Sequence, residues 1–454
     1  MRGSAVILLR QIFLFAAATL TVAVAAERPP TLLAMGLARE ATAAAEAQDY
    51  PTYLARMEQA VALRPDYPRL LVNLAAAQSL NERFEDAVAT LERVAALGVH
   101  SPVEKAKAFT AMRERPDFKD VVKKLAANLQ NVKGEGEIAF QVPGMTGLVE
   151  GIAWREKTGQ FFFGDVHHHC IWVRTSTAPD KKGNADVKVA RFTAEDSPLL
   201  GVFGLVVDEE RGVLWAAASA VTAMDGYTDA QHGAAGVAEI DLETGAVRRV
   251  VLVPADGRPH VIGDLALGPD GSVWMPDSGA IVLWRLAPGA ARPEAFIESD
   301  EFNSLQGAVV APDGRSVIVA DYPGGLLRVD VATRAVRRLE PLPDTTLLGI
   351  DGLVRAPNGD LVAIQNGVRP DRVLRIILDG TNDAVVEMNI LESSHLNLTA
   401  PSLGCIGPDG NFFFVGNANW THFDEPGATA TPPRPVPIFK TKLAPDAPPP
   451  KKKK

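Results

Sequence analysis

The chain has 454 residues, of which 47% are hydrophobic and 22% are charged, as is ordinary for a globular protein with room for two or three domains. Its formal net charge of −9 argues against nucleic acid as a partner, because affinity for phosphate backbones depends on clustered Lys and Arg. Composition therefore indicates a folded, acidic protein that does not bind nucleic acid.

The first 25 residues have the pattern of a secretory signal peptide. Two arginines precede an apolar run from Ile12 to Val24, and a small-residue cleavage pattern ends at Ala25. A membrane anchor is the alternative, although a run of 13 residues is short for a span. After cleavage no integral membrane span is expected, because no later stretch approaches 18 apolar residues. We therefore predict a signal peptide over residues 1–25 and a periplasmic or secreted mature protein.

Residues 29–132 are rich in alanine and have the apolar spacing of helices. Tyr50, Phe84 and Phe118 are separated by 34 residues twice over, and each opens a similar helical pattern. This is the tetratricopeptide period, so the stretch resembles a short array of two to three such repeats. Arrays of this kind commonly cradle a peptide, which makes a protein partner one interpretation. The other is that the helices only support the domain that follows.

Between residues 134 and 443 one hairpin pattern recurs. Its clearest copy runs from Leu347 to Gly367, where two apolar runs flank a Pro-Asn-Gly turn. Five further copies begin at Val149, Val202, Ile262, Leu305 and Pro401. Their central glycines or equivalent residues are 43 to 60 residues apart, a period typical of propellers. We therefore predict a multidomain chain with all-α tetratricopeptide-like repeats followed by an all-β six-bladed propeller of four-stranded blades.

The two ends of the propeller region are expected to meet. Gly134–Val142 has the pattern of a lone strand, and Pro437–Leu443 is its natural partner in the last blade. Such a pairing would remove the open edges of the ring. Residues 444–454, rich in Pro and Lys, are predicted to form a disordered tail. The Pro-Asp-Gly turns at Asp270, Asp313 and Asp409 are expected to be hairpin turns at the end of the blades opposite the binding face.

The chain contains two cysteines, Cys170 in the first repeat and Cys405 in the last. In a closed ring these blades are neighbours, and an exported chain could join the two thiols in a disulfide. However, Cys170 opens the third strand of its blade, whereas Cys405 lies on an innermost strand. Two separate buried thiols are therefore the favoured interpretation.

The innermost strands of a propeller line a central channel, and one residue of each repeat is expected at its mouth. In chain order these residues are Glu150, Phe203, Gly263, Gln306, Asp351 and Leu403. Two carboxylates and one amide oxygen converge there. Hard oxygen ligands of this kind suit Ca²⁺, Mg²⁺ or Mn²⁺, with water filling the remaining positions.

Three of these segments carry a resemblance to a known family. VEGIAW at Glu150, LQGAVVAPDG at Gln306 and IDGLVRAPNG at Asp351 resemble the senescence-marker-protein/gluconolactonase, or regucalcin-like, family of six-bladed propellers. The resemblance implies one divalent cation (Ca²⁺, Mn²⁺, Mg²⁺ or Zn²⁺) held by Glu150, Gln306 and Asp351, with Asp351 as the catalytic base. Gln306 stands where the family has Asn. The family's Asn-Asp-Gly is here Gly263-Asp264-Leu265, so Asp264 is retained as a substrate-binding candidate and the preceding Asn is absent.

Loops between second and third strands supply further substrate-binding candidates on the same face. The first blade contributes Asp165, His167 and His169, which could form a transition-metal site or a general base, or simply a solvated polar loop. Later blades contribute Asp277, Asp321, Tyr322, Asn366 and Asn417. Together they would form a polar rim for a sugar-like or hydroxylated ligand. The alternative is turn chemistry, since Asp and Asn favour tight turns.

Two functions from different classes remain in view. The leading one is an exported, divalent-metal-dependent hydrolase of a lactone or a similar small cyclic ester in the propeller channel. The other is a non-catalytic ligand-binding or scaffold protein, in which the propeller binds a small hydroxylated or lactone-like ligand and the helical repeats recruit a protein. The sequence shows no phosphate loop, dinucleotide fingerprint or serine-nucleophile elbow.

Overall fold

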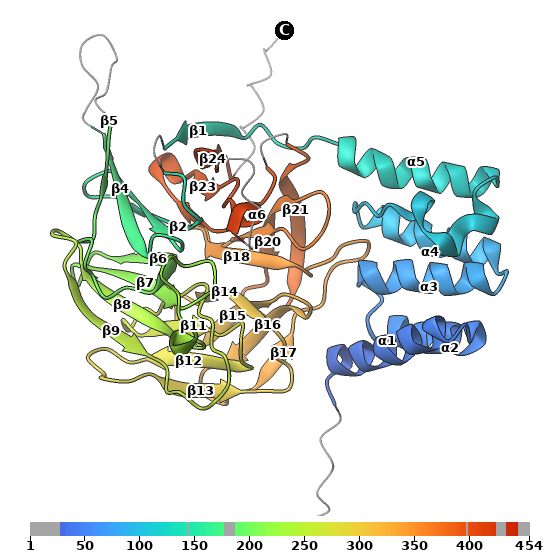
Figure 1. The fold of residues 1–454 in the computed structure, drawn as a ribbon, viewed down its shortest axis with the longest axis horizontal. Helices are drawn as coiled ribbons and strands as arrows, with labels where there is room; N and C mark the ends of the chain where they lie inside the picture. Colours follow the sequence, from blue (N-terminus) through green and yellow to red (C-terminus); the bar gives the residue numbers. More distant parts are fainter. Residues whose placement is uncertain (1–27, 143–144, 177–186, 396–397, 424–432, 444–454) are drawn as a thin grey trace, which may run out of the picture.

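The computed structural model describes residues 28–142, 145–176, 187–395, 398–423 and 433–443. They form a β-propeller with a layer of helices packed against one side of it (Figure 1). The predicted signal peptide and the predicted tail, residues 1–25 and 444–454, lie outside the described residues. Among the described residues, no helix combines the length and the apolar character that crossing a membrane requires.

The helical region is a stack of antiparallel helices. Its elements are α1 (Pro30–Glu46), α2 (Tyr50–Leu63), α3 (Pro68–Leu80), α4 (Phe84–Ala96) and α5 (Pro116–Gln130), with the 3₁₀ turns η1 (Val103–Lys105) and η2 (Lys107–Met112) before α5. Prolines in the first turns of α1, α2, α3 and α5 suit the start of a helix, where the missing N–H would have no partner. Met57, Leu71 and Leu91 are fully buried between the helices.

The helix starts agree in part with the 34-residue period. Helices α2 and α4 begin at Tyr50 and Phe84, and α1 with α2 and α3 with α4 form two helical hairpins. The third unit is different, because 3₁₀ turns replace its first helix and Phe118 lies inside the first turn of α5. The helical architecture is therefore present, whereas tetratricopeptide repeats as such are not confirmed.

The described residues of the propeller form six four-stranded antiparallel sheets, each numbered as a blade from the channel outward. Blades 1 to 3 are built from β2 (Val149–Arg155), β3 (Gln160–Asp165), β4 (Cys170–Ser176), β5 (Val187–Arg191); β6 (Gly201–Asp208), β7 (Val213–Ser219), β8 (Ala235–Asp241), β9 (Val247–Leu252); and β10 (Ala266–Leu267), β11 (Val273–Pro276), β12 (Val282–Leu286), β13 (Glu294–Glu298).

Blades 4 to 6 follow in the same order. Their strands are β14 (Leu305–Val310), β15 (Ser316–Asp321), β16 (Gly325–Asp330), β17 (Val336–Arg338); β18 (Ile350–Arg355), β19 (Leu361–Gln365), β20 (Arg372–Leu378), β21 (Val385–Ser393); and β22 (Gly404–Ile406), β23 (Phe412–Val415), β24 (Pro437–Thr441), β1 (Glu137–Gln141). Short helical turns η3 (Asp229–Gln231), η4 (Pro408–Gly410) and α6 (Trp420–Phe423) lie in connections. Each inner strand contacts the inner strands of its two neighbours, which closes the ring.

Strands from both ends of the region complete blade 6, as the sequence predicts. The N-terminal strand β1 pairs with the C-terminal strand β24, with Glu137 opposite Lys440 and Gln141 opposite Pro437. The first and last strands of the propeller are therefore hydrogen-bonded to each other within one blade. This pairing closes the ring and satisfies the edge of β24 that faces β1.

The recurrent glycines of the inner strands allow these strands to lie close together around the channel. A Cβ atom at Gly151 would stand 2.0 Å from the carbonyl oxygen of Phe203 in the next blade. At Gly307 it would stand 2.6 Å from the carbonyl oxygen of Asp351. Real Cβ atoms do not approach this closely, so any side chain would push neighbouring inner strands apart.

Both cysteine thiols are free. Cys170 is buried at the start of β4, and Cys405 is partly buried on the inner strand β22. The interpretation as two separate thiols is therefore confirmed. Burial raises the pKa of the Cys170 thiol to about 12, which makes it unreactive at neutral pH.

The helical region is attached to blades 4 and 5 at the end where their second and third strands are joined (Figure 1). Arg64 after α2 is fully buried and donates through Nη2 to the carbonyl oxygen of Gly324 at 3.2 Å. Arg338 of β17 forms an ion pair with Asp66 at 2.7 Å. Val368 of the propeller is buried in the core of the helices. The helices are thus anchored beside the channel mouth and not at the opposite end of the ring.

Candidate functional site

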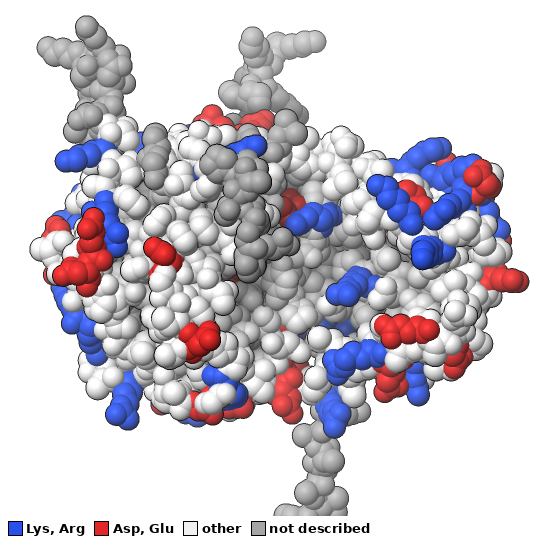
Figure 2. Space-filling view, viewed as in Figure 1, with Lys and Arg blue, Asp and Glu red and all other residues white. Residues whose placement is uncertain are grey.

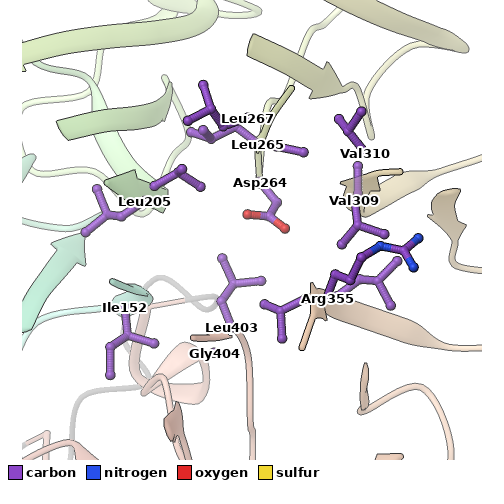
Figure 3. A pocket seen from close by; sticks show the side chains of 15 residues that line it. Ile152, Leu205, Asp264, Leu265, Leu267, Val309, Val310, Arg355, Leu403 and Gly404 are labelled. Carbon is purple, nitrogen blue, oxygen red and sulfur yellow. The ribbon is translucent and has the colours of Figure 1, made fainter. Parts of the chain in front are cut away.

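Three carboxyl groups lie at the channel within electrostatic reach of one another. Glu150 and Asp351 lie at the second positions of the inner strands β2 and β18, and Asp264 lies two residues before β10. Asp264 points into the central cavity (Figure 3). The negative charge of Asp351 raises the pKa of both Glu150 and Asp264. None of the three forms an ion pair with a Lys, Arg or His among the described residues.

Burial and repulsion make Glu150 a weak acid. Its side chain is only 6% exposed, and burial together with the nearby Asp351 charge raises its pKa to about 8. The indole N–H of Trp420 donates to Oε1 and acts in the opposite direction. At neutral pH Glu150 therefore holds a proton most of the time.

Asp351 is the more acidic partner of this pair. Burial raises its pKa to about 6, and a hydrogen bond from Nδ2 of Asn366 to Oδ2, 2.7 Å long, limits the rise. For Asp264 burial raises the pKa to about 8, with smaller opposing contributions from backbone N–H groups. The channel thus combines one carboxylate that is mostly ionised at pH 7 with two that are mostly protonated.

The cavity below these groups is largely apolar. It has a volume of about 230 Å³ and extends between the inner strands of the blades. Among the described residues that line it, Asp264 and Arg355 are the ionisable ones, while the others include Ile152, Leu205, Leu265, Val309, Leu353 and Leu403 (Figure 3). Arg355 lies at the end of β18 and donates through Nη1 to the carbonyl oxygen of Gly359 at 2.9 Å. The cavity suits a small apolar group with a polar end at Asp264, the one carboxyl group among the described lining residues.

The donor set fits a hard divalent cation by its chemistry, because Glu150, Asp351 and Gln306 offer oxygen and have no basic neighbour. Gln306 donates through Nε2 to Oγ of Ser304 at 3.0 Å, which leaves its carbonyl oxygen as the possible ligand atom. Within the described ranges, no three or more His, Cys, Asp or Glu side chains gather closely enough to hold a metal ion. A cation here would therefore be held by fewer than three such side chains, with the Gln306 carbonyl and water as further ligands.

Three predicted rim carboxylates are instead found inside their blades. Asp165 and Asp321 end the second strands of their blades, Asp277 directly follows one, and all three are fully buried. Asp277 accepts hydrogen bonds from the backbone N–H groups of Val261, Gly279 and Ala280 and from the indole of Trp284. Such contacts fix the turn that follows each strand. They agree with the interpretation as turn chemistry, and none of these three carboxylates lines the channel cavity.

The histidines of blade 1 lie in a turn and not on an extended backbone. His169 has a positive φ of 39°, and Nδ1 of His167 lies 2.7 Å from the carbonyl oxygen of Ala223. The intervening His168, which the sequence did not single out, is the one that contacts Asp165, at 2.8 Å. The ring of Phe423 in α6 packs 4.4 Å from that of His167. His167 and His169 therefore do not face a common point as the alternation of a strand would require.

Two rim residues do approach the channel carboxylates. The hydroxyl of Tyr322 donates to Oδ1 of Asn366 at 2.9 Å, and Asn366 in turn donates to Asp351. Asn417 has a local role, since its Oδ1 accepts from the backbone N–H of Asn419 at 3.0 Å. Tyr322 and Asn366 thus extend the site from Asp351 toward the helical region.

Trp420 is a site residue that the sequence analysis missed. It begins the short helix α6, packs near Phe203 and donates to Glu150, about 270 residues away in sequence. A tryptophan following Asn417 and Asn419 in the loop of the last blade was the available signal. Nothing local in the sequence pairs it with the first blade.

No protein-family model matches the chain, and no curated protein matches it. Solved structures with a similar shape include a calcium-binding protein, regucalcin, from Agrobacterium tumefaciens, with a TM-score of 0.46 and 16% identity, covering 68% of this chain and 93% of that one. A luciferin-regenerating enzyme has a TM-score of 0.44 and 12% identity, covering 67% and 94%. Virginiamycin B lyase from Staphylococcus aureus has a TM-score of 0.41 and 14% identity, covering 62% and 82%. The six-bladed architecture itself rests on the strand pairing described above.

Proposed function

We propose that the protein is a hydrolase of a lactone or similar small cyclic ester, acting at the channel mouth with the help of a divalent cation. The observation that supports this proposal best is the group Glu150, Asp264 and Asp351, three carboxylates without a basic partner whose pKa values are raised unequally. Pairs of acids with separated pKa values are typical of general acid–base sites.

The protein groups can divide the proton transfers of ester hydrolysis between them. Asp351, ionised at pH 7, takes a proton from the water whose oxygen attacks the ester carbonyl carbon. As the ring C–O bond breaks, protonated Asp264 gives its proton to the leaving oxygen, so the product is a single hydroxy acid that carries both the new carboxyl group and the new hydroxyl group. Asn366 holds the Asp351 carboxylate in place through its 2.7 Å hydrogen bond.

A cation held by Glu150, Gln306 and Asp351 would polarise the carbonyl oxygen of the substrate. Ca²⁺, Mg²⁺ and Mn²⁺ suit this oxygen donor set better than Zn²⁺, because the proposed ligands include neither His nor Cys. The apolar channel wall would exclude bulk water from the bond that is cleaved.

The test begins with thermal unfolding, which needs no guessed substrate. Chelator-treated protein is titrated with each cation, and binding to the folded state is expected to raise its Tm by mass action. Asp351→Asn and Glu150→Gln should lose the rise, whereas Asp313→Asn, in an exposed hairpin turn, should keep it. A panel of lactones is then assayed for release of acid. If no cation raises Tm and no lactone is hydrolysed, the proposal is wrong.

The second candidate is a non-catalytic ligand-binding protein. It is favoured by the fixed position of the helices beside the mouth, where Arg64, Asp66 and Val368 join the two parts. This face of the helices is already covered, so a protein partner recruited by the helical region would use another face. Ligand binding without turnover of any lactone would favour this candidate over the hydrolase.

Export to a periplasmic or extracellular space forms part of both candidates, since it follows from the pattern of residues 1–25. It is tested by N-terminal sequencing of the protein recovered from the producing organism. A mature N-terminus just after Ala25 is expected, and an intact Met1 in the purified protein would contradict it.

A further inference from the structure

A second cavity lies between the helical region and the propeller. Its volume is about 630 Å³, within the range of sites for small organic ligands. The helical side contributes residues of α3 and the segment after α4, and the propeller side contributes the loops that follow β15 and β19. Neither part of the chain forms this cavity alone.

The charged side chains that line this cavity are both cationic. Among the described residues that line it, Arg69 and Arg369 are charged at neutral pH and no Asp or Glu is present. On the face seen in Figure 2, several Lys and Arg side chains lie along the boundary between the propeller and the helices. In a protein with a net charge of −9, two arginines on the wall of one cavity, with no acidic side chain among the described residues of that wall, favour an anionic ligand.

The two arginines have donors to spare. Arg69, in the first turn of α3, is exposed and makes no hydrogen bond or ion pair with any described residue. Arg369 forms an ion pair with Asp371 and hydrogen bonds to the carbonyl oxygens of Asn366 and Val368, and all of these use Nη1. Its Nε and Nη2 groups are not used. Guanidinium groups in this state suit a carboxylate, which they can bind through paired hydrogen bonds.

Most of the remaining wall is apolar or aromatic, with His100, Ser101 and Asn366 as further polar residues. Val72, Val94 and Val368 line the cavity together with the rings of Tyr67 and Tyr322. The hydroxyl of Tyr322 is occupied by Asn366, so its ring presents a largely apolar face. A ligand that fills this space must therefore carry an apolar or aromatic body as well as an anionic group.

We propose that the cavity between the helices and blades 4 and 5 binds a small organic acid with an aromatic or aliphatic body and one carboxylate, held by Arg69 and Arg369. The proposal does not depend on hydrolysis in the channel. It gives the helical region a direct role, since α3 supplies one of the two cationic groups.

The experiment is isothermal titration calorimetry of the full mature chain at pH 7 with 4-phenylbutyrate as the probe. Its neutral amide, 4-phenylbutyramide, has the same body without the charge. We expect the carboxylate to bind and the amide to bind about tenfold more weakly, because hydrogen bonds between ionised partners are stronger than those of a neutral amide.

Variants locate the site. Arg69→Gln should weaken binding of 4-phenylbutyrate about tenfold. Arg69→Lys should retain most of it, because the charge remains. Arg39→Gln removes an exposed, unpaired arginine of α1 that does not line the cavity, and should bind like the parent. Absence of binding to the parent protein, equal affinity for acid and amide, or unchanged affinity in Arg69→Gln would each overturn the proposal.

Discussion

At the scale of single residues, the channel is defined by acids that are not neutralised. A buried carboxylate without a basic partner costs folding free energy whenever it is ionised, and stable proteins seldom keep three of them together without a use. Glu150, Asp264 and Asp351 therefore make the stability of the propeller depend on pH.

The pH dependence can be measured at Asp264. Its pKa is about 8 in the folded protein, against about 3.9 in an unfolded chain. Between these values the folded protein binds a proton that the unfolded chain has released, so the free energy of unfolding falls as pH rises. Asp264→Asn removes this loss. In the presence of a chelator, its Tm should equal that of the parent near pH 4 and exceed it by at least about 2 °C at pH 8.

The control is Asp313→Asn, which removes an exposed carboxylate from a hairpin turn. Thermal unfolding at pH 4, 5, 6, 7 and 8 should show no trend in the difference between this variant and the parent. A pH-independent effect of Asp264→Asn would contradict the buried, protonated state of Asp264.

A second prediction at this scale concerns the close approach of inner strands. Gly151→Ala places a Cβ atom 2.0 Å from the carbonyl oxygen of Phe203, and a backbone atom cannot move aside without shifting its strand. We expect the variant to lose at least about 3 kcal/mol of stability, measured by denaturant unfolding. Gly263→Ala is the matched control, since a Cβ atom there meets no atom within 4 Å. Equal stability of the two variants would refute the packing argument.

At the scale of elements, the attachment of the helices depends on buried charge. Arg64 contacts Asp66, Thr31 and the carbonyl oxygen of Gly324, and it is completely buried. Arg372, also buried, donates through Nη1 to the carbonyl oxygen of Leu97 at 3.1 Å. Because these bonds leave little freedom at the boundary, the helical region and blades 4 and 5 should move as one unit.

Arg64→Met tests this attachment. The change keeps an unbranched side chain and leaves Arg338 as the one cationic partner of Asp66 among the described residues, so the free energy of unfolding should fall by about 2 kcal/mol. Hydrogen exchange should also become faster at the boundary of α3 and the loop after β15. Arg56→Met removes an exposed pair with Glu40 and should change stability by less than about 1 kcal/mol. A larger loss of stability in Arg56→Met than in Arg64→Met would show that the buried Arg64 does not hold the helical region to the propeller.

The sequence predicted those features that depend on residues close together in the chain. Hairpin turns such as Asn358-Gly359 placed the strands, and the residues before the inner-strand glycines placed Glu150 and Asp351 at the channel. Distant contacts were not accessible, as with Trp420 and Glu150 or Arg64 and Gly324. The structural role of two of the predicted rim carboxylates could have been anticipated from the sequence. Asp165 and Asp277 each accept from a tryptophan seven residues later, a repeated spacing that indicates a structural role.

At the scale of the whole molecule, ring closure through β1 and β24 should decide whether the chain folds. A chain that ends at Val436 lacks β24, so β1 and β23 are left with unpaired edges. We expect it to be insoluble or to unfold at least about 10 °C below the parent, because β23 and β1 both lose the strand that lies between them. A chain that ends at Leu443 lacks only residues 444–454 and should have the Tm of the parent. Comparable stability of the two truncated chains would show that the pairing is dispensable.

The pairing of the first and last strands also sets an order of events during synthesis. On the ribosome, the helical region and β1 emerge first, yet β1 has no partner until Pro437 has been made, and the helices have no surface to pack against before blades 4 and 5 exist. Nascent chains therefore carry an unpaired strand through the translation of five blades, a state that invites capture by chaperones or by other nascent copies. A polypeptide released before Pro437 would contain Glu150, Asp264 and Asp351 without the closed ring that brings them together.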